Sequence, residues 1–323
     1  MRIFLAGATG VVGNQLVPLL LEHGHEVVGS TRSPEKVERL RAAGAQPVLL
    51  GLLDAQEVRN ALREAAPQVV VHEATALAKM GSNPRKVDQE FAPTNRLRSE
   101  GTDNLIAAQA IGAQRVAQSF AGWPSAREGG PVKSEEDPLD PNPPAAMRRT
   151  LAAIRHLEEA VVGADGLGGV VLRYGAFYGP GTSLAADGAH AKPIRRLFPI
   201  IGSGAGVWSC IHIADAASAT LAAAERGRRG IYNIVDDEPA PVPEWLPAFA
   251  AALGAKPPWR APAWLGRLLG GEQTVSIMTS VRGASNAKAK RELGWTPGYP
   301  SWRRGFSDTA EETRRTKGTT VGS

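Results

Sequence analysis

Residues 3–13 read IFLAGATGVVG, and this stretch decides the fold class. A short apolar run, Ile3 to Ala6, is followed by glycines at positions 7, 10 and 13 and then by a segment with the apolar spacing of a helix. Glycines at this spacing permit a tight turn, a close backbone approach to pyrophosphate and an open helix N-terminus. The stretch therefore predicts a strand, a dinucleotide-binding turn and a helix, in that order.

Short apolar runs alternate with helical segments along most of the chain. We expect further strands at 26–29, 47–50, 69–72, 115–119, 169–173 and 231–235, and helices at about 35–43, 55–65, 99–111 and 147–162. This alternation predicts an α/β fold with a Rossmann-type, doubly wound parallel sheet. The proline-rich segment 124–146 is expected to be a loop.

The second half of the chain predicts a smaller C-terminal lobe that is interleaved with the sheet. We assign 1–178 and 207–236 to an NADP-binding domain, and 179–206 and 237–306 to a substrate-binding lobe. Residues 307–323 are polar and nearly free of large apolar side chains, so we expect a disordered tail there.

Composition restricts the class of protein. The chain has 323 residues, 43% of them hydrophobic, which is enough for a sizeable core. Its one cysteine, Cys210, cannot form an internal disulfide, and no residue cluster has the spacing of a metal site. The net charge of +5 comes from basic residues spread along the chain, which argues against nucleic-acid binding. Without a targeting or membrane-spanning segment, we expect a cytoplasmic monomer or homodimer that acts on a small molecule.

The second predicted strand indicates which dinucleotide binds. A site for NAD usually has an acidic residue about 20 residues after the glycines, whereas a 2′-phosphate requires positive charge there. Between Val27 and Pro34 the only charged residue is Arg32, flanked by the hydroxyls of Thr31 and Ser33. These three residues predict NADPH, although a solvated loop arginine is the alternative.

Several motifs together resemble one enzyme family over residues 1–306. They are GATGVVG at 7–13, Asp54 after the third strand, His72-Glu73-Ala74, Asn95 ahead of GTDNLIAAQ, Ser119, RYGAFYGPG at 173–181, HIADAA at 212–217 and LGWTP at 293–297. The chain thereby resembles the extended short-chain dehydrogenase/reductases, which are NAD(P)-dependent epimerases, dehydratases and reductases.

The resemblance implies a set of cofactor contacts. Leu53 and Asp54 would lie beside the adenine, Ala74 to Ala76 on the nicotinamide side, and Asn95 would brace nearby backbone. Asp54 could equally cap a helix. The full implied set is Gly7, Thr9, Gly10, Val11, Val12, Gly13, Thr31, Arg32, Ser33, Leu53, Asp54, Ala74, Thr75, Ala76, Asn95, Ser119, Tyr174, Gly175, Ala176 and Phe177.

The sequence departs from the family at the catalytic pair. Family enzymes carry Tyr-x-x-x-Lys on the helix expected at 147–162, with a glutamate four residues after the lysine. Aligning that glutamate with Glu158 puts Thr150 and Ile154 at the two positions, and no tyrosine precedes position 174. The usual proton donor is therefore missing.

Three residues remain as catalytic candidates. Ser119 matches the family's catalytic Ser/Thr, and its hydroxyl and that of Thr150 can orient a carbonyl. Tyr178 could face the cofactor, and a titrating His212 is a weaker candidate. Large apolar side chains where the substrate should lie favour a flat, aromatic substrate; they are Leu77, Met80, Phe91, Phe120, Trp123, Phe177, Tyr178 and Trp208.

The sequence thus predicts NADPH-dependent reduction of a ketone on a bulky aromatic polyketide, in which the substrate itself assists with the proton. In this it resembles the atypical ketoreductases of actinobacterial angucyclinone pathways. Two alternatives stay open: a nucleotide-sugar epimerase or dehydratase, which would recycle its cofactor, and a catalytically inactive NADP-binding sensor.

Overall fold

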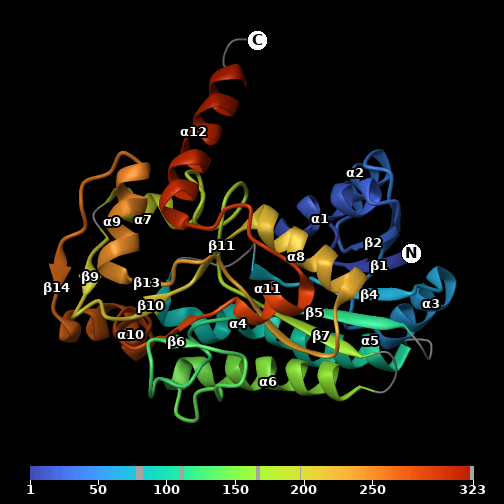
Figure 1. The fold of residues 1–323 in the computed structure, drawn as a ribbon, viewed down its shortest axis with the longest axis horizontal. Coiled ribbons are helices and arrows are strands. Elements are labelled where there is room, and N and C mark those ends of the chain that lie inside the picture. The colour runs from blue at the N-terminus through green and yellow to red at the C-terminus, as the bar shows by residue number, and fades with distance from the viewer. Residues whose placement is uncertain (78–82, 109–112, 165–167, 197, 321–323) are drawn as a thin grey trace.

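A seven-stranded parallel sheet forms the centre of the molecule (Figure 1). The computed structural model describes residues 1–77, 83–108, 113–164, 168–196 and 198–320. The sheet has the order β12-β7-β5-β4-β1-β2-β3. Its strands are β1 (Arg2–Ala6), β2 (Glu26–Thr31), β3 (Gln46–Leu49), β4 (Val69–His72), β5 (Gln114–Phe120), β7 (Gly169–Tyr174) and β12 (Gly230–Ile234). The predicted doubly wound parallel sheet is confirmed.

Helices cover both faces of the sheet. One face carries α1 (Val11–Glu22), α2 (Val37–Ala42) and α8 (Ile213–Arg226), and the other carries α3 (Ala55–Ala65), α5 (Thr102–Ala108) and α6 (Arg148–Gly163) (Figure 1). Helix α4 (Val87–Arg96) packs on α6 and leads through a π-helical turn, η4 (Leu97–Gly101), into α5. Short 3₁₀ turns are η1 (Pro34–Lys36), η3 (Pro84–Lys86) and η5 (Ala145–Met147).

Strand order places the site. The chain builds β1, β2 and β3 outward in one direction, then returns to the other side of β1 with β4. Ligands of open α/β sheets bind at such a switch point, outside the carboxyl ends of the strands. The glycine turn after β1 and the segment after β4 meet there.

Most of the remaining elements form a second group, at the left of Figure 1, while α11 (Ala287–Leu293) packs against α8 and β12. The elements of this group are β6 (Val132–Lys133), β8 (Ala176–Tyr178), α7 (Ala191–Arg195), β9 (Ile200–Ile201), β10 (Val207–Trp208), β11 (Cys210–His212), β13 (Ala240–Pro241), α9 (Val242–Ala252), β14 (Arg260–Ala261), α10 (Ala263–Thr279), β15 (Gly283–Ala284) and α12 (Trp302–Thr320). A second core around Trp245, Phe249, Trp302 and Phe306 holds much of this group together.

The structure describes a helix over residues 307–320, part of the segment 307–323 in which we expect a disordered tail. Helix α12 continues to Thr320 and projects from the body (Figure 1). Trp302, Phe306 and Ala310 recur at intervals of four residues and are all buried, so one face of the first turns packs against α9.

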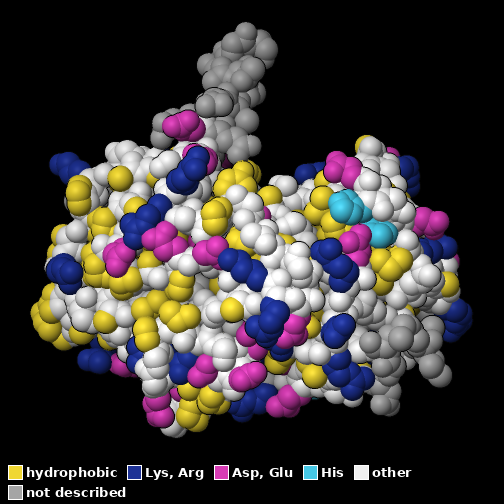
Figure 2. Space-filling view, viewed as in Figure 1, with side chains coloured by type: hydrophobic (Ala, Val, Ile, Leu, Met, Phe, Trp, Pro, Cys, Tyr) yellow, Lys and Arg dark blue, Asp and Glu magenta, His cyan; other side chains and the backbone are white. Residues whose placement is uncertain are grey.

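The surface is mixed in character. Lysines and arginines are spread over the visible face, while hydrophobic side chains gather over the second group of elements (Figure 2). Trp259, Trp264, Leu268 and Leu269 on β14, α10 and their connections are exposed. Among the described residues, no helix is both long and apolar enough to cross a membrane.

Candidate active site

The glycine turn between β1 and α1 has the shape that a bound pyrophosphate requires. Gly7 adopts a φ of +90°, and Gly10 donates its N–H to the Gly7 carbonyl over 2.9 Å. A Cβ on Gly7 would lie 2.7 Å from the backbone nitrogen of Ala74. Gly10 caps α1 without a side-chain acceptor, so the first N–H groups of the helix face outward for an anion. The turn therefore fits a dinucleotide.

At the end of β2, the three residues predicted to contact a 2′-phosphate are placed differently from one another. Thr31 is buried, and its hydroxyl lies 3.0 Å from that of Thr9 and accepts the Ser33 N–H over 3.2 Å. Arg32 is exposed. Thr31 therefore shapes the turn from inside, and the contact of Arg32 with a 2′-phosphate stays a prediction.

The predicted adenine contacts lie at the start of α3. Asp54 caps this helix, because its Oδ1 accepts the N–H groups of Gln56 and Glu57 over 2.9 Å each. Leu53 beside it is exposed. The capping role is present in the structure, and the adenine contact stays a prediction.

After β4, the chain is fixed from two sides. Ala74 donates its N–H to Nδ1 of His72, and Ala76 donates to the hydroxyl of Thr94. His72 Nε2 therefore carries the hydrogen that it shares with the Leu97 carbonyl, 3.1 Å away. Burial lowers the pKa of His72 to about 4, so the ring stays neutral. Ala74, Thr75 and Ala76 are thus held against the glycine turn.

Ser119 does not face an open site in this structure. Its hydroxyl donates to Oε1 of Glu158 over 2.7 Å, and the residue is buried. Arg173 binds both oxygens of the same carboxylate at 2.8 and 2.6 Å. Successive residues of a strand point to opposite faces, so Ser119 shares the α6 face with Ala117. This differs from the carbonyl-orienting role predicted for it.

A second buried arginine lies near this pair. Arg98 on η4 is buried, and its Nη1 has no hydrogen-bond partner among the described residues. Burial lowers its pKa to about 10, and the Glu158 charge opposes that shift. The Glu158 carboxylate therefore balances two buried guanidinium groups.

Helix α6 carries neither tyrosine nor lysine along its 16 residues. Thr150 and Ile154 are both buried, and the Asn95 amide donates to the Thr150 hydroxyl over 3.1 Å. Thr150 accepts in this bond, so its own hydrogen remains for another acceptor. The structure brings Asn95 and Thr150 together, with no acidic group beside them on α6.

Of the aromatic residues at 174–178, Tyr174 and Tyr178 are fully buried and Phe177 is half-buried. The Tyr178 ring lies 5.2 Å from that of His212 and 5.3 Å from that of Phe306. Its hydroxyl has no partner among the described residues, and burial raises its pKa well above the usual value. A phenol of this kind is a poor proton donor. Gly175 and Ala176 line the strand edge, and Phe177 packs on Tyr174.

The residues predicted to line the substrate pocket lie in different parts of the fold, and none of them lines the two cavities described below. Phe120 lies near Trp123, with ring centroids 6.4 Å apart, whereas Trp208 packs against Trp245 in a tilted arrangement and donates to the Ile277 carbonyl. Leu77 and Phe91 are half-buried, and Met80 lies outside the described residues. The predicted aromatic side chains are divided between the end of β5, where Phe120 and Trp123 lie, and the second core, against which Trp208 packs.

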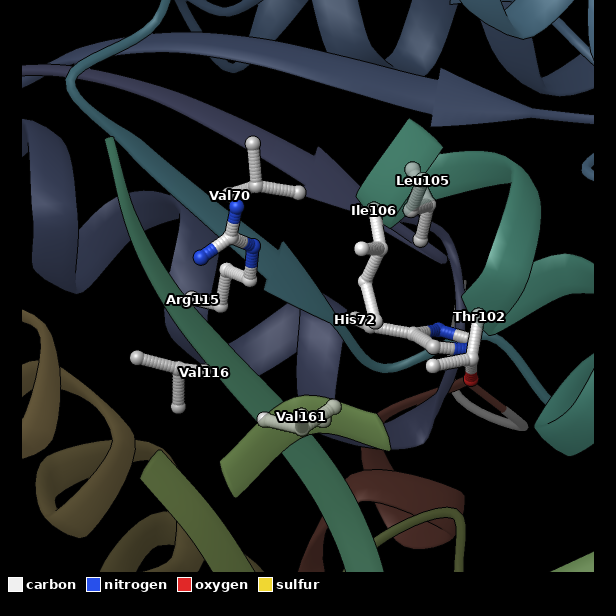
Figure 3. A pocket seen from close by; sticks show the side chains of 9 residues that line it. Val70, His72, Thr102, Leu105, Ile106, Arg115, Val116 and Val161 are labelled. Atoms are coloured by element: carbon white, nitrogen blue, oxygen red, sulfur yellow. The ribbon is translucent and has the colours of Figure 1, made fainter. Parts of the chain in front are cut away.

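Two described cavities lie apart from these residues. The cavity in Figure 3, between β4, β5, α5 and α6, measures about 20 Å³ and is lined by His72, Thr102, Arg115 and apolar side chains. It has room for a single water molecule. A larger apolar cavity of about 160 Å³ lies between η3, β9, β14 and α10.

Sequence reasoning missed three charged residues of this region. Glu73 directly follows His72 at the end of β4, Arg98 lies in the π-helical turn, and Arg173 pairs with Glu158. A charge next to an apolar strand was the available signal for Glu73 and Arg173. No such signal was available for Arg98, because the sequence does not indicate that the helix widens into a π-helical turn at Leu97–Gly101.

Comparisons with known proteins agree with this architecture. The family model of the NAD dependent epimerase/dehydratase family matches residues 3–235. A 3-diazoavenalumate denitrifying reductase from a Streptomyces species is 44% identical over 315 residues, which cover 95% of this chain and 99% of the relative.

A second relative is the 4-hydroxy-2-methyl-3-oxo-4-farnesyl-3,4-dihydroquinoline-1-oxide ketoreductase of Stigmatella aurantiaca. It is 30% identical over 264 residues, 79% of this chain and 74% of that protein. Among solved structures, Thermus thermophilus UDP-glucose 4-epimerase in complex with NAD aligns with a TM-score of 0.72 at 25% identity, over 97% of this chain and 99% of that one.

Proposed function

Because this chain belongs to the NAD-dependent epimerase/dehydratase family and is an oxidoreductase, we propose that it reduces an aromatic small molecule without supplying an acidic side chain. One observation carries the proposal: α6, the helix expected to hold the family's Tyr and Lys, has buried Thr150 and Ile154 at those positions. A reaction that needs no proton from the protein is compatible with that helix.

The glycine turn and the strand ends would hold the cofactor. Gly7, Gly10 and the N-terminus of α1 would bind the pyrophosphate, and Ala74 to Ala76 would line the path of the nicotinamide. A reduced nicotinamide supplies a hydride, and a diazonium carbon that accepts it releases N₂ and needs no further proton.

We therefore propose a diazo-bearing aromatic compound as the substrate class. The 44% identical relative is named for denitrifying reduction of a diazo compound. Phe120, Trp123 and Phe177 near the strand ends offer flat apolar surface to an aromatic ring. Ile154 adds apolar volume in place of an ammonium group, and a missing ammonium also avoids repelling a cationic diazonium.

Other parts of the chain would orient such a substrate. The Thr150 hydroxyl, positioned by the Asn95 amide, can donate one hydrogen bond to it. The second core, with Trp208 and Trp245, would form the wall of the substrate-binding lobe. The protein then contributes binding, orientation and exclusion of water.

Ketone reduction is the second candidate, because the Stigmatella relative is named as a ketoreductase. An alkoxide does need a proton, which a phenol or enol next to the ketone could supply within the substrate. If Tyr178→Phe abolished ketone reduction without affecting cofactor binding, Tyr178 would be the acid instead.

A substrate panel distinguishes these functions. The protein is incubated with NADPH and either an aromatic diazonium salt, an aromatic hydroxyketone or a nucleotide sugar, and cofactor oxidation and N₂ are measured. We expect one N₂ per cofactor oxidised with the diazonium salt, above a control without protein. Oxidation with the ketone alone would favour ketone reduction, turnover without net oxidation would favour an epimerase, and binding alone would favour a sensor.

We also propose that the cofactor is NADPH, and Arg32→Ala tests this. The exposed Arg32 guanidinium is the one positive group among the three predicted phosphate contacts. A charged hydrogen bond is worth about 1.5–3 kcal/mol, so NADPH affinity should fall by about one to two decades and NADH affinity should not change. Arg39→Ala, an exposed arginine on α2, is the matched control. Equal affinities of the unmodified protein for NADH and NADPH would contradict the proposal.

A further inference from the structure

Four groups are connected in a row in the interior behind the glycine turn. Oε1 of Glu73 lies 2.9 Å from the Tyr174 hydroxyl, which lies 2.6 Å from the Thr220 hydroxyl, which lies 2.7 Å from the Ala216 carbonyl oxygen. All three side chains are at least 95% buried. At this burial each contact has to be a hydrogen bond.

Three contacts require three hydrogens. The Ala216 carbonyl can only accept, and the two hydroxyls carry one hydrogen each. If Tyr174 donates to Glu73 and Thr220 donates to Ala216, the 2.6 Å contact between the two hydroxyls has no hydrogen. A protonated Glu73 that donates to Tyr174 leaves the Tyr174 hydrogen for that contact. An ionised Glu73 would leave one of the three contacts without a hydrogen.

The second carboxyl oxygen of Glu73 also indicates that this side chain is a neutral acid. Oε2 of Glu73 is buried and has no hydrogen-bond partner among the described residues. A buried carboxylate oxygen without a donor is costly, whereas a neutral acid is tolerated. In agreement, burial raises the pKa of Glu73 to about 8.

Glu73 also lies against the proposed cofactor site. It is the first residue after β4, and its N–H donates to the Ala6 carbonyl at the end of β1 over 2.8 Å. A Cβ placed on Gly7 would lie 2.8 Å from the carbonyl carbon of Glu73. The turn whose N–H groups would face a pyrophosphate therefore packs directly on this residue.

We propose that Glu73 is a positioning residue, kept as a neutral acid beneath the glycine turn, and that its ionisation weakens binding of the anionic dinucleotide. The inference rests on the proposed function, since it assumes a dinucleotide at that turn. A negative charge buried behind the turn repels the phosphates through a low-dielectric interior. Binding at alkaline pH should therefore take up a proton.

Apart from Tyr174, the titratable groups named around Glu73 have other partners. Tyr174 faces it from β7, and α8 presents Thr220, while Asp215 of α8 accepts the N–H groups of Gly298 and Tyr299. His72 points to the Leu97 carbonyl. Asp236, whose pKa burial also raises to about 8, accepts the Trp302 N–H under α12 and is unchanged in a Glu73 variant.

The test is the pH dependence of NADPH affinity in the unmodified protein, Glu73→Gln and Glu57→Gln. Glu57 is an exposed glutamate on α3. From pH 7 to pH 9, affinity should fall about tenfold in the unmodified protein and in Glu57→Gln, because a pKa near 8 leaves about a tenth of Glu73 neutral at pH 9. It should change less than about twofold in Glu73→Gln, whose amide supplies the third hydrogen without charge. An equal fall in Glu73→Gln would overturn the inference.

Calorimetry of the unmodified protein gives a result that does not depend on the folding of a variant. At pH 8, in two buffers of different ionisation enthalpy, NADPH binding should take up about half a proton. Binding without proton uptake would overturn the role of Glu73 and leave the proposed function standing. Absence of binding at every pH would contradict the proposed function itself.

Discussion

Gly7→Ala is expected to lower dinucleotide affinity by about 100-fold or more, because two charged hydrogen bonds to the pyrophosphate are together worth about 3 kcal/mol or more. A Cβ at this position would lie 2.7 Å from the nitrogen and 2.8 Å from the Cα of Ala74. Both atoms belong to backbone that β4 holds in place, so the turn itself has to move. The N–H groups of the turn and of α1 would then miss the pyrophosphate.

Gly24→Ala is the matched control. Gly24 follows α1 with a φ of +75°, close to the +90° of Gly7, but a Cβ there would meet nothing within 4 Å. Both substitutions cost about 1 kcal/mol or more of backbone strain, and only one displaces the turn. The measurement is an NADPH titration, with thermal unfolding of each variant as a check on folding. Similar affinities of the two variants would contradict a cofactor site at Gly7.

Glu158→Ala is expected to destabilise the fold by about 3–5 kcal/mol, the usual cost of leaving a buried charge without its partner. Arg173 would lose both of its bonds to Glu158, and the Ser119 hydroxyl would lose its acceptor. Arg98 would lose the one charge that favours its ionised form. The free energy of unfolding in urea measures the effect.

Glu100→Ala serves as the control for Glu158→Ala. Glu100 pairs with Arg96 in the same chain region, but both side chains are at least half exposed. Water already solvates these charges, so removal should change the unfolding free energy little. If Glu158→Ala lost no more stability than Glu100→Ala, the buried pair would not support the sheet as described.

Much of the fold could be predicted because its signals are local. The glycines at 7, 10 and 13 and the alternation of apolar strands with helices determine the doubly wound sheet. Helix α4 and the π-helical turn were missed, because Pro93 and the polar residues around it hide the helical pattern. The helix over 307–320 was missed because packing against α9, rather than propensity, stabilises its first turns.

The candidate site was predictable only in part. Residues that act through backbone geometry, such as Gly7 and Gly10, carry their signal in residue type. The direction of a side chain at a strand end cannot be read from residue type, because a shift of one residue turns the side chain to the other face of the sheet. The Ser119 side chain thus points to the α6 face of the sheet and binds Glu158. Glu73, which follows β4, lies beneath the glycine turn and binds Tyr174.

The substrate surface could not be located from sequence, because aromatic residues fill cores and pockets alike. Trp208 was expected in the pocket and packs against Trp245, and Tyr178 is enclosed by His212 and Phe306. The tertiary contacts are what distinguish Trp208 and Tyr178, which pack in the interior, from Phe120 and Trp123.

The most direct test of a reductase without its own acid is the origin of the hydrogen in the product. NADPH deuterated at C4 of the nicotinamide is incubated with an aromatic diazonium salt in ordinary water, and the product is analysed by mass spectrometry beside a control without protein. We expect one deuterium on the carbon that lost nitrogen and one N₂ for each cofactor oxidised. A product that keeps its nitrogen, or one whose new hydrogen comes from water, would contradict hydride transfer without a protein acid.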